Sequence, residues 1–254
     1  MLRRTMAEFD VTAGLQHVTK RIEEVLQSRT KEIKSPKPLL VAVSKTKPAE
    51  TVIEAYKAGQ RHFGENYVQE LVEKSQHPDI LAQCADIKWH FIGHLQGNKV
   101  NKVLKLPNLH MIQTVDSEKL ANSLDAACSK LQPALSEPLR VLIQINTSGE
   151  DVKSGIDAVA APSLYQYIKT NLKHLQLEGI MTIGAFGFDY SNGPNPDFVS
   201  LLKVQRAICE ANDLKPETVQ VSMGMSNDYD KAIEMGSTIV RVGTSIFGYR
   251  APKA

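Results

Sequence analysis

Short runs of β-branched and aliphatic residues alternate with amphipathic helical segments along most of the chain, and this alternation limits the possible folds more than any other sequence feature. It predicts eight strands, at residues 39–44, 61–64, 88–93, 110–115, 140–146, 179–184, 220–223 and 239–243. The helices predicted between them lie near residues 48–58, 66–76, 97–105, 117–131, 162–173, 196–211 and 227–235. Strands separated by helices of this length must pair in parallel, because parallel neighbours need a crossover connection.

Eight such units predict an α/β protein with a closed (β/α)8 TIM barrel. A doubly wound open sheet is the competing architecture, because it has the same alternation. An extra N-terminal helix is indicated by apolar residues spaced four and three apart, namely Val11, Leu15, Val18, Ile22 and Val25. A barrel also suits a chain of 254 residues, since α/β barrels of about this length form one domain. We therefore expect one domain over residues 1–254, with a helical extension at 11–35.

The charge balance indicates which classes of partner are disfavoured, and the cysteine content indicates the cellular compartment. The chain has 30 Lys+Arg against 28 Asp+Glu, and the net charge of +2 is too small to favour nucleic acid or a membrane surface as partner. No run approaches the ~20 apolar residues of a membrane span. Three dispersed cysteines without metal or CxxC spacing are typical of a reducing compartment. We predict a cytoplasmic protein, monomeric or weakly dimeric, and Arg3, Arg4 and a second start at Met6 leave a mitochondrial fraction open.

Lys45 directly follows the first predicted strand, at the end of the barrel where functional groups gather. An ammonium at the edge of an apolar strand is partly desolvated, which lowers its pKa and exposes the free amine as a nucleophile. Schiff-base formation with an aldehyde or ketone uses such an amine. The alternative is a solvated lysine that merely ends the strand. Lys47 is a second candidate, in a more loop-like position before Pro48.

The loops after the last two strands are where TIM barrels usually bind phosphate. Residues 222–226 form a glycine-containing turn that runs into a helical pattern, and free N–H groups at a helix start favour an anion. An ordinary helix cap at Ser226 is the alternative. Gly243 and Thr244 provide a second close backbone approach and a hydroxyl after the eighth strand. Arg241 lies inside that apolar strand, so we expect it to have a buried acceptor.

Four further residues have two interpretations each. Asn66 is either a ligand contact or a plain helix cap. His90, within a strand, is more typical of a core histidine than of a base, and His94 fits either role. Met181 either walls a flat ring or packs in the core. No HExxH, Walker, Gly-x-Ser-x-Gly or GxGxxG motif occurs, so zinc proteolysis, nucleotide hydrolysis and hydrolase triads lack support, and we predict no metal site.

Five segments together strongly resemble the pyridoxal-phosphate homeostasis protein family, formerly called the proline synthetase co-transcribed homologue. They are Val41-Ala42-Val43-Ser44-Lys45-Thr46-Lys47-Pro48, Phe63-Gly64-Glu65-Asn66-Tyr67-Val68-Gln69-Glu70, Trp89-His90-Phe91-Ile92-Gly93-His94-Leu95-Gln96, Ser222-Met223-Gly224-Met225-Ser226 and Val240-Arg241-Val242-Gly243-Thr244. The match extends from about residue 39 to residue 248. It implies a barrel like the N-terminal domain of alanine racemase and of bacterial-type ornithine decarboxylase.

The resemblance also implies a cofactor, pyridoxal 5'-phosphate (PLP), held as an aldimine on Lys45. By position, it implies that Arg241 faces the pyridine nitrogen. The remaining implied contacts are Ser226, Gly243 and Thr244 to the phosphate, and Asn66 and Met223 along the ring.

An arginine at the ring nitrogen favours a carrier over an enzyme. PLP enzymes that need a strong electron sink keep this nitrogen protonated, usually with a carboxylate, whereas arginine cannot accept the proton. Racemases on this fold also need a second acid/base from a C-terminal domain, which we expect to be absent because the chain ends at Ala254. We predict a PLP-binding protein of vitamin B6 homeostasis that buffers PLP or delivers it to PLP-dependent apo-enzymes, with no catalytic residue. An amino-acid racemase, a lysine-dependent aldolase and a cofactor-free partner-binding protein are the alternatives.

Overall fold

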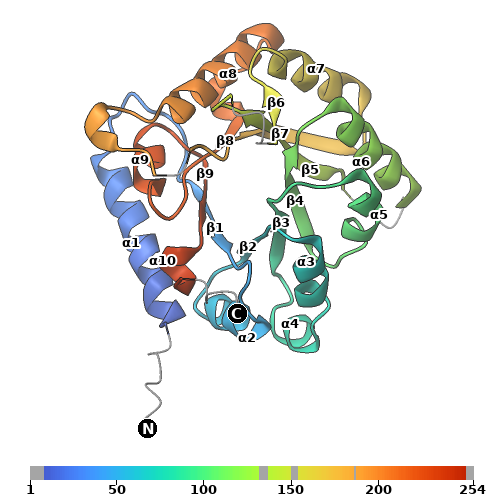
Figure 1. The fold of residues 1–254 in the computed structure, drawn as a ribbon, viewed down its shortest axis with the longest axis vertical. Coiled ribbons are helices and arrows are strands. Elements are labelled where there is room, and N and C mark those ends of the chain that lie inside the picture. Colours follow the sequence, from blue (N-terminus) through green and yellow to red (C-terminus); the bar gives the residue numbers. More distant parts are fainter. Residues whose placement is uncertain (1–8, 132–136, 150–153, 186, 250–254) are drawn as a thin grey trace.

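The strands form a closed ring surrounded by helices (Figure 1) in the computed structural model, which describes residues 9–131, 137–149, 154–185 and 187–249. The strand order is β4-β3-β2-β1-β9-β8-β7-β5, all pairs are parallel, and the additional pairing of β4 with β5 closes the ring. The predicted TIM barrel is therefore confirmed. The open doubly wound sheet is wrong, because such a sheet would leave two edge strands unpaired.

Each barrel strand overlaps one predicted strand. The strands are β1 (Leu39–Val43), β2 (His62–Glu65), β3 (Lys88–Phe91), β4 (Leu109–Val115), β5 (Leu139–Asn146), β7 (Leu175–Met181), β8 (Gln220–Ser222) and β9 (Ile239–Val242). The largest difference is in β7, which begins four residues before the predicted 179 and pairs there with β5. Polar Gln176 and Glu178 interrupt the apolar run at this point and obscure the strand. The two-residue β6 (Ile156–Asp157) was not predicted, and it pairs with the end of β5.

The helices lie between the strands in the predicted order. They are α1 (Val11–Ser28), α2 (Ala49–Lys57), α3 (Val68–Ser75), α4 (Pro78–Gln83), α5 (Val100–Val103), α6 (Glu118–Leu131), α7 (Ala161–Asn171), α8 (Pro196–Asn212), α9 (Tyr229–Glu234) and α10 (Thr244–Phe247), with 3-10 turns at Gly97–Lys99, Tyr190–Asn192 and Pro216–Thr218. The short α4 and α10 were not predicted. The helical extension to residue 35 is wrong: α1 ends at Ser28, and the extended Arg29 donates to the Ser35 hydroxyl and carbonyl.

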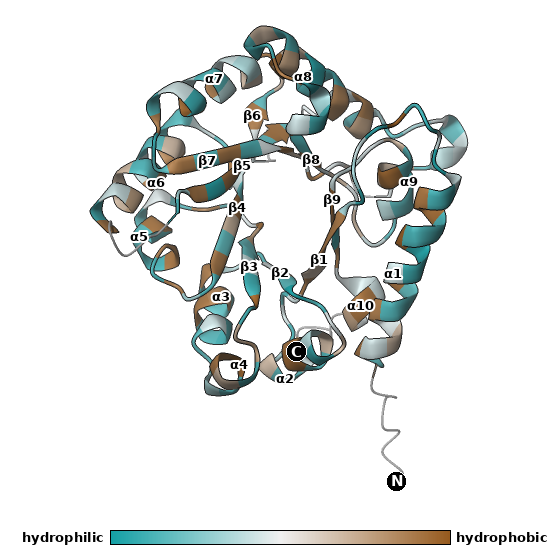
Figure 2. Cartoon of the chain, turned by 180° about the vertical axis from the view of Figure 1, so that it is seen from behind, coloured by the Kyte–Doolittle hydropathy of each residue, from teal (hydrophilic) through white to brown (hydrophobic). Residues whose placement is uncertain are grey.

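Helix α1 packs on α10 and α9, on the outside of the barrel next to strands β1 and β9 (Figure 1). Its buried residues are those of the predicted apolar stripe, and Figure 2 shows hydrophilic residues on its outward side. At Gly14 an added Cβ would lie 2.8 Å from the Ile246 carbonyl oxygen, so the two helices approach to backbone contact. α1 therefore supports the segment that follows β9.

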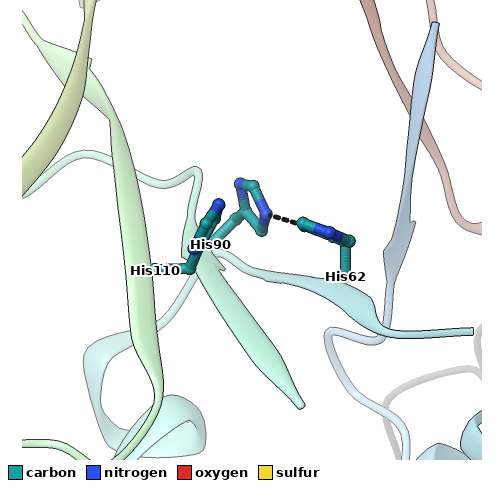
Figure 3. A group of neighbouring side chains, drawn as sticks. All are labelled: His62, His90 and His110. Atoms are coloured by element: carbon teal, nitrogen blue, oxygen red, sulfur yellow. Dashed lines mark hydrogen bonds between the residues drawn. The ribbon is translucent and has the colours of Figure 1, made fainter. Parts of the chain in front are cut away.

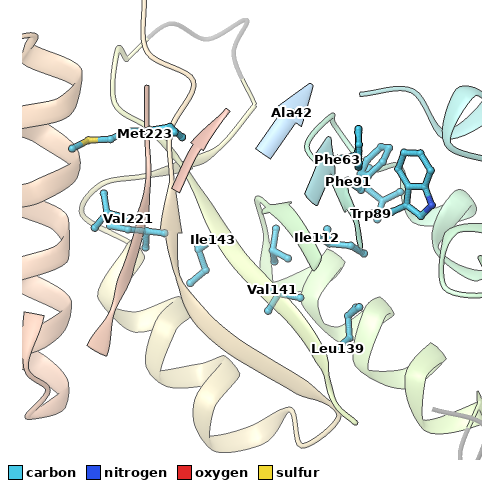
Figure 4. Packing of buried hydrophobic residues seen from close by; sticks show 14 of the residues in the cluster. Ala42, Phe63, Trp89, Phe91, Ile112, Leu139, Val141, Ile143, Val221 and Met223 are labelled. Carbon is cyan, nitrogen blue, oxygen red and sulfur yellow. The ribbon is translucent and has the colours of Figure 1, made fainter. Parts of the chain in front are cut away.

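The hydrophobic core has two parts. The larger part lies between the strands and the helices and includes Phe63, Trp89, Phe91, Val141, Ile143 and Val221 (Figure 4). The smaller part is inside the barrel and consists of Val41, Met111, Leu142, Met181 and Ile239. Met181 is fully buried there, so the core interpretation of this residue is confirmed. Among the described residues, no helix is long and apolar enough to cross a membrane.

Candidate functional site

A cavity of about 400 Å³ opens at the carboxyl ends of the barrel strands. Six of the seven residues predicted to bind a ligand line it: Lys45, Asn66, Ser226, Arg241, Gly243 and Thr244. They follow or belong to β1, β2, β8 and β9, which are neighbours in the ring. The pairing of β9 with β1 joins the two ends of the sequence and thereby builds the cavity.

Lys45 lies half-buried in the turn that follows β1, and both of its neighbours are fixed by hydrogen bonds. The Ser44 hydroxyl donates to Glu65 Oε1 at 2.7 Å, and the backbone N–H of Thr46 donates to Glu70 Oε2 at 2.6 Å. Thr46 has a φ of 66°, which is rare for a β-branched residue and turns the chain sharply after Lys45. Lys47 does not line the cavity, because its Nζ donates to the Tyr249 carbonyl at 3.0 Å.

A buried ion pair supports this turn from below. Lys74 Nζ lies 2.7 Å from Glu65 Oε1, and it also donates to the Ser44 carbonyl at 2.7 Å. The Glu65 side chain is 0% exposed, and its Oε2 has no hydrogen-bond partner among the residues that the structure describes. Burial raises the pKa of the Glu65 carboxyl, and the charge of Lys74 opposes this shift. The pair therefore fixes the end of β1, from which Lys45 projects.

The loops after β8 and β9 are hydrogen-bonded to each other. The Gly243 N–H donates to the Ser226 hydroxyl at 3.1 Å, and the Ser245 hydroxyl donates to the Ser226 carbonyl at 3.4 Å. A Cβ on Gly243 would lie only 3.2 Å from the Val43 carbonyl oxygen, so a side chain here would crowd β1. Backbone and hydroxyl groups therefore face the cavity without side chains in between.

Arg241 is the charged residue most deeply buried at the cavity, at 4% exposure. Its Nη1 donates to the Ser222 hydroxyl at 2.5 Å and its Nη2 to the Thr182 carbonyl at 2.7 Å, so the expected buried acceptors exist. Within the described residues, no carboxylate forms an ion pair with it. Burial lowers the pKa of Arg241 to about 10, and the charge of Asp228 opposes the shift, so the guanidinium remains cationic at pH 7.

A chain of hydrogen bonds continues from Arg241 into the barrel. The Ser222 hydroxyl donates to Gln113 Oε1 at 2.8 Å, and Gln113 Nε2 lies 3.0 Å from His90 Nδ1. His90 Nε2 in turn lies 2.8 Å from His62 Nδ1. His90 is thus a fully buried core histidine with both ring nitrogens hydrogen-bonded. Sequence reasoning missed Ser222 and Gln113, although polar residues in apolar strands are a usable signal.

Asn66 and His94 are also placed by the structure. Asn66 is not a helix cap, because α3 begins after Tyr67. The residue lines the cavity, and its buried Oδ1 has no hydrogen-bond partner in the described part of the chain. Gly93 makes room for it, since a Cβ there would lie 1.9 Å from the Asn66 carbonyl oxygen. His94 Nδ1 lies 3.1 Å from Asp116 Oδ2 and borders a smaller cavity of about 180 Å³.

The expected position of Met223 is wrong. Its side chain is 0% exposed and belongs to the outer core, on the helix side of the sheet (Figure 4). Successive side chains alternate across a strand, and Ser222 already points inward to Arg241, so Met223 must point outward. Met225, two residues later, lines the cavity instead, together with Asp228, which sequence reasoning also missed.

Comparison with known proteins agrees with this architecture. Residues 19–251 match the family model described as alanine racemase, N-terminal domain. The chain is 51% identical over 244 residues to the pyridoxal phosphate homeostasis protein of Mus musculus, covering 96% of this chain and 88% of that protein. It is 41% identical over 245 residues to the protein of the same name from Vibrio cholerae, covering 94% and 96%. The chain belongs to the pyridoxal phosphate homeostasis protein family.

Solved structures place the family on the same barrel. PipY of Synechococcus elongatus PCC7942, in a structure with PLP bound, has a TM-score of 0.71 and 32% identity, covering 89% of this chain and 100% of that chain. Alanine racemase from E. faecalis has a TM-score of 0.64 at 19% identity, covering 96% of this chain and 60% of that chain. The racemase comparison shows a shared fold alone.

Proposed function

We propose that this member of the family binds PLP in the 400 Å³ cavity through a covalent bond to Lys45, and that it buffers or delivers PLP within vitamin B6 homeostasis. One observation carries the proposal. The cavity combines an amine, a buried guanidinium and two backbone loops, which together match an aldehyde, a ring nitrogen and a phosphate. The relatives named pyridoxal phosphate homeostasis protein and the PLP-bound PipY structure support the same ligand.

The residues present fit this cofactor. PLP supplies an aldehyde, which condenses with a primary amine and releases water. Lys45 would provide that amine. Asn66 has a buried oxygen that lacks a partner within the described segments and would accept from a ligand donor. Ser226 and Thr244 would donate their hydroxyls to the phosphate, because hydroxyl groups of glycine-containing loops suit an anion. Gly243 would hold the Ser226 hydroxyl in place through its N–H and would leave room for the phosphate because it has no side chain.

Arg241 makes strong catalysis unfavourable. It would face the pyridine nitrogen as a hydrogen-bond donor, and it cannot accept a proton because it is already cationic at pH 7. A ring nitrogen without a proton withdraws electrons weakly, whereas strong PLP catalysis depends on that withdrawal. The relatives are also named homeostasis proteins rather than enzymes. We therefore propose a carrier without robust activity, whose recipients are PLP-dependent apo-enzymes.

The test is a visible absorption titration of the metal-free, cofactor-free full chain with PLP. We expect a yellow complex with one PLP per chain. Lys45→Ala should abolish the yellow band, whereas Lys47→Ala, the matched control two residues away, should retain it. Equal binding by the wild type and Lys45→Ala would contradict the proposal. Formation of D-alanine in a chiral assay would indicate the racemase alternative. A colourless protein that traps a sugar phosphate would indicate the aldolase.

A further inference from the structure

Three histidines point toward one another inside the barrel (Figure 3). His62 is the first residue of β2, and His90 and His110 belong to the next two strands. One ring nitrogen from each lies within 4.8 Å of the others, and the ring centroids are 5.1–5.2 Å apart. His90 is fully buried, whereas His62 and His110 are half-buried toward the amino end of the barrel. The cluster is thus both preformed and reachable.

We propose that His62, His90 and His110 form a binding site for one divalent transition-metal ion, with Zn²⁺ the best match. The argument for this metal site does not rest on PLP binding, although hydrogen bonds through Gln113 and Ser222 connect His90 with Arg241. Three imidazoles around an ion leave a fourth position open for water, a ligand set that suits Zn²⁺ in tetrahedral geometry.

The hydrogen bonding of the cluster is incomplete. Three neutral imidazole rings carry six nitrogens, and the hydrogen bonds within the described residues involve both nitrogens of His90 and Nδ1 of His62. The remaining nitrogen of His62 and both nitrogens of His110 have no partner in the described part of the chain. A metal ion needs uncharged imidazoles with an available lone pair. None of these three nitrogens is among the buried atoms without a partner in the described residues, so water can reach them. An ion would therefore displace water from these nitrogens rather than break hydrogen bonds within the protein.

The distances require only small side-chain movements. A tetrahedral ion with metal–nitrogen bonds of about 2.0–2.1 Å places its ligand nitrogens about 3.4 Å apart. His62 Nδ1 and His90 Nε2 are 2.8 Å apart and would separate slightly, while the third nitrogen approaches from within 4.8 Å. The rings of His62 and His110 are only half-buried, so protein does not enclose them on every side.

Gln113 supplies the outer partner that a metal-bound histidine requires. The proton that His90 and His62 now share would move to His90 Nδ1, so no net proton is released. The Gln113 amide lies 3.0 Å from this nitrogen, and a half-turn of the amide presents its oxygen as the acceptor. The same half-turn replaces the bond that the Ser222 hydroxyl now donates to this oxygen by one from the Gln113 NH2 group to that hydroxyl. Ligating histidines usually donate their second N–H to such a carbonyl or carboxylate oxygen.

Two neighbouring cations oppose the binding of an ion. Lys88 and Arg140 both act electrostatically on His110. Arg140 is neutralised by Glu178, whose Oε1 lies 2.6 Å from its Nη1, and Lys88 is exposed to solvent. Exposed charges are screened by water and salt, so the repulsion weakens the site without abolishing it.

The experiment is a Co²⁺ titration of the tag-free, chelator-treated full chain, followed by the d–d absorption of the ion. We expect one Co²⁺ per chain with the spectrum of a four-coordinate nitrogen site, and displacement by Zn²⁺. His62→Gln and His110→Gln should each weaken binding about tenfold or more. His17→Gln, on the exposed face of α1, is the matched control and should leave binding unchanged.

X-ray absorption of the Co²⁺-loaded wild type needs no variant and should count three imidazole ligands. Binding that is equal in wild type and His62→Gln, a spectrum with thiolate charge-transfer bands, or no stoichiometric binding would each overturn the proposal. The PLP titration is measured separately in the same variants, so failure of the metal site and failure of the PLP site are distinguishable.

Discussion

We predict that replacing Lys74 by Met lowers the free energy of unfolding, and the buried Glu65 carboxylate determines by how much. The substitution removes the ammonium that lies 2.7 Å from Glu65 Oε1 and leaves a carboxylate that is 0% exposed without its cation. Breaking a buried ion pair costs about 3–5 kcal/mol. The folded protein can lower this cost by binding a proton at Glu65. Protonating a glutamate at pH 7, about 2.7 units above its ordinary pKa of about 4.3, costs about 1.36 kcal/mol per unit, or roughly 3.7 kcal/mol in total.

The cost should therefore depend on pH. Burial raises the pKa of Glu65, and loss of Lys74 raises it further. An acid whose folded pKa lies above its unfolded value of about 4.3 loses stability as the pH rises through that value. The deficit of Lys74→Met should thus be about 3–4 kcal/mol at pH 7 and shrink to about 1 kcal/mol at pH 5.

Urea unfolding followed by circular dichroism at both pH values measures this difference. The double variant Lys74→Met with Glu65→Gln should recover most of the loss, because it removes the charge as well as its partner. Lys102→Met, on the exposed surface, should change the free energy of unfolding by no more than about 0.5 kcal/mol. A deficit of equal size at pH 5 and pH 7 would refute this reasoning and indicate lost packing instead.

Three further predictions concern the core and the loops. Met223→Ala should lower the free energy of unfolding in urea by about 2–5 kcal/mol and leave PLP affinity unchanged, because Met223 lies in the outer core. Met225→Ala should instead weaken PLP binding and leave the free energy of unfolding nearly unchanged. Equal effects of the two variants on both quantities would contradict these positions. Gly243→Ala places a Cβ 3.2 Å from the Val43 carbonyl oxygen and should weaken PLP binding about tenfold, or about 1.4 kcal/mol, in an absorption titration; unchanged affinity would argue against this loop. Gly14→Ala places a Cβ 2.8 Å from the backbone of α10 and should lower the free energy of unfolding in urea by about 1–3 kcal/mol; an unchanged value would contradict the close approach of the two helices.

The fold was predictable because its signal is repetitive. Eight apolar runs separated by helical periods leave few topologies, and parallel pairing with right-handed crossovers closes the ring. The errors occurred where the signal is short or polar. Gln176 and Glu178 concealed the start of β7, and α10 contains only four residues.

The site was predictable where a residue directly follows a strand, as Lys45 and Gly243 do. Met223 was misplaced because the direction of a side chain depends on strand alternation, and Ser222 takes the inward position of β8. The histidine cluster could not be predicted at all. His62, His90 and His110 come from three neighbouring strands, and their rings meet only when the barrel has formed.

Borohydride reduction of the PLP-loaded protein, followed by peptide mass spectrometry, tests the central claim most directly. Reduction makes the bond between the cofactor and its amine permanent, so the modified peptide identifies the lysine. We predict one pyridoxyl phosphate per chain, attached to Lys45 beside Arg241 and Ser226. Attachment to Lys47, or a label spread over surface lysines, would contradict the proposed site.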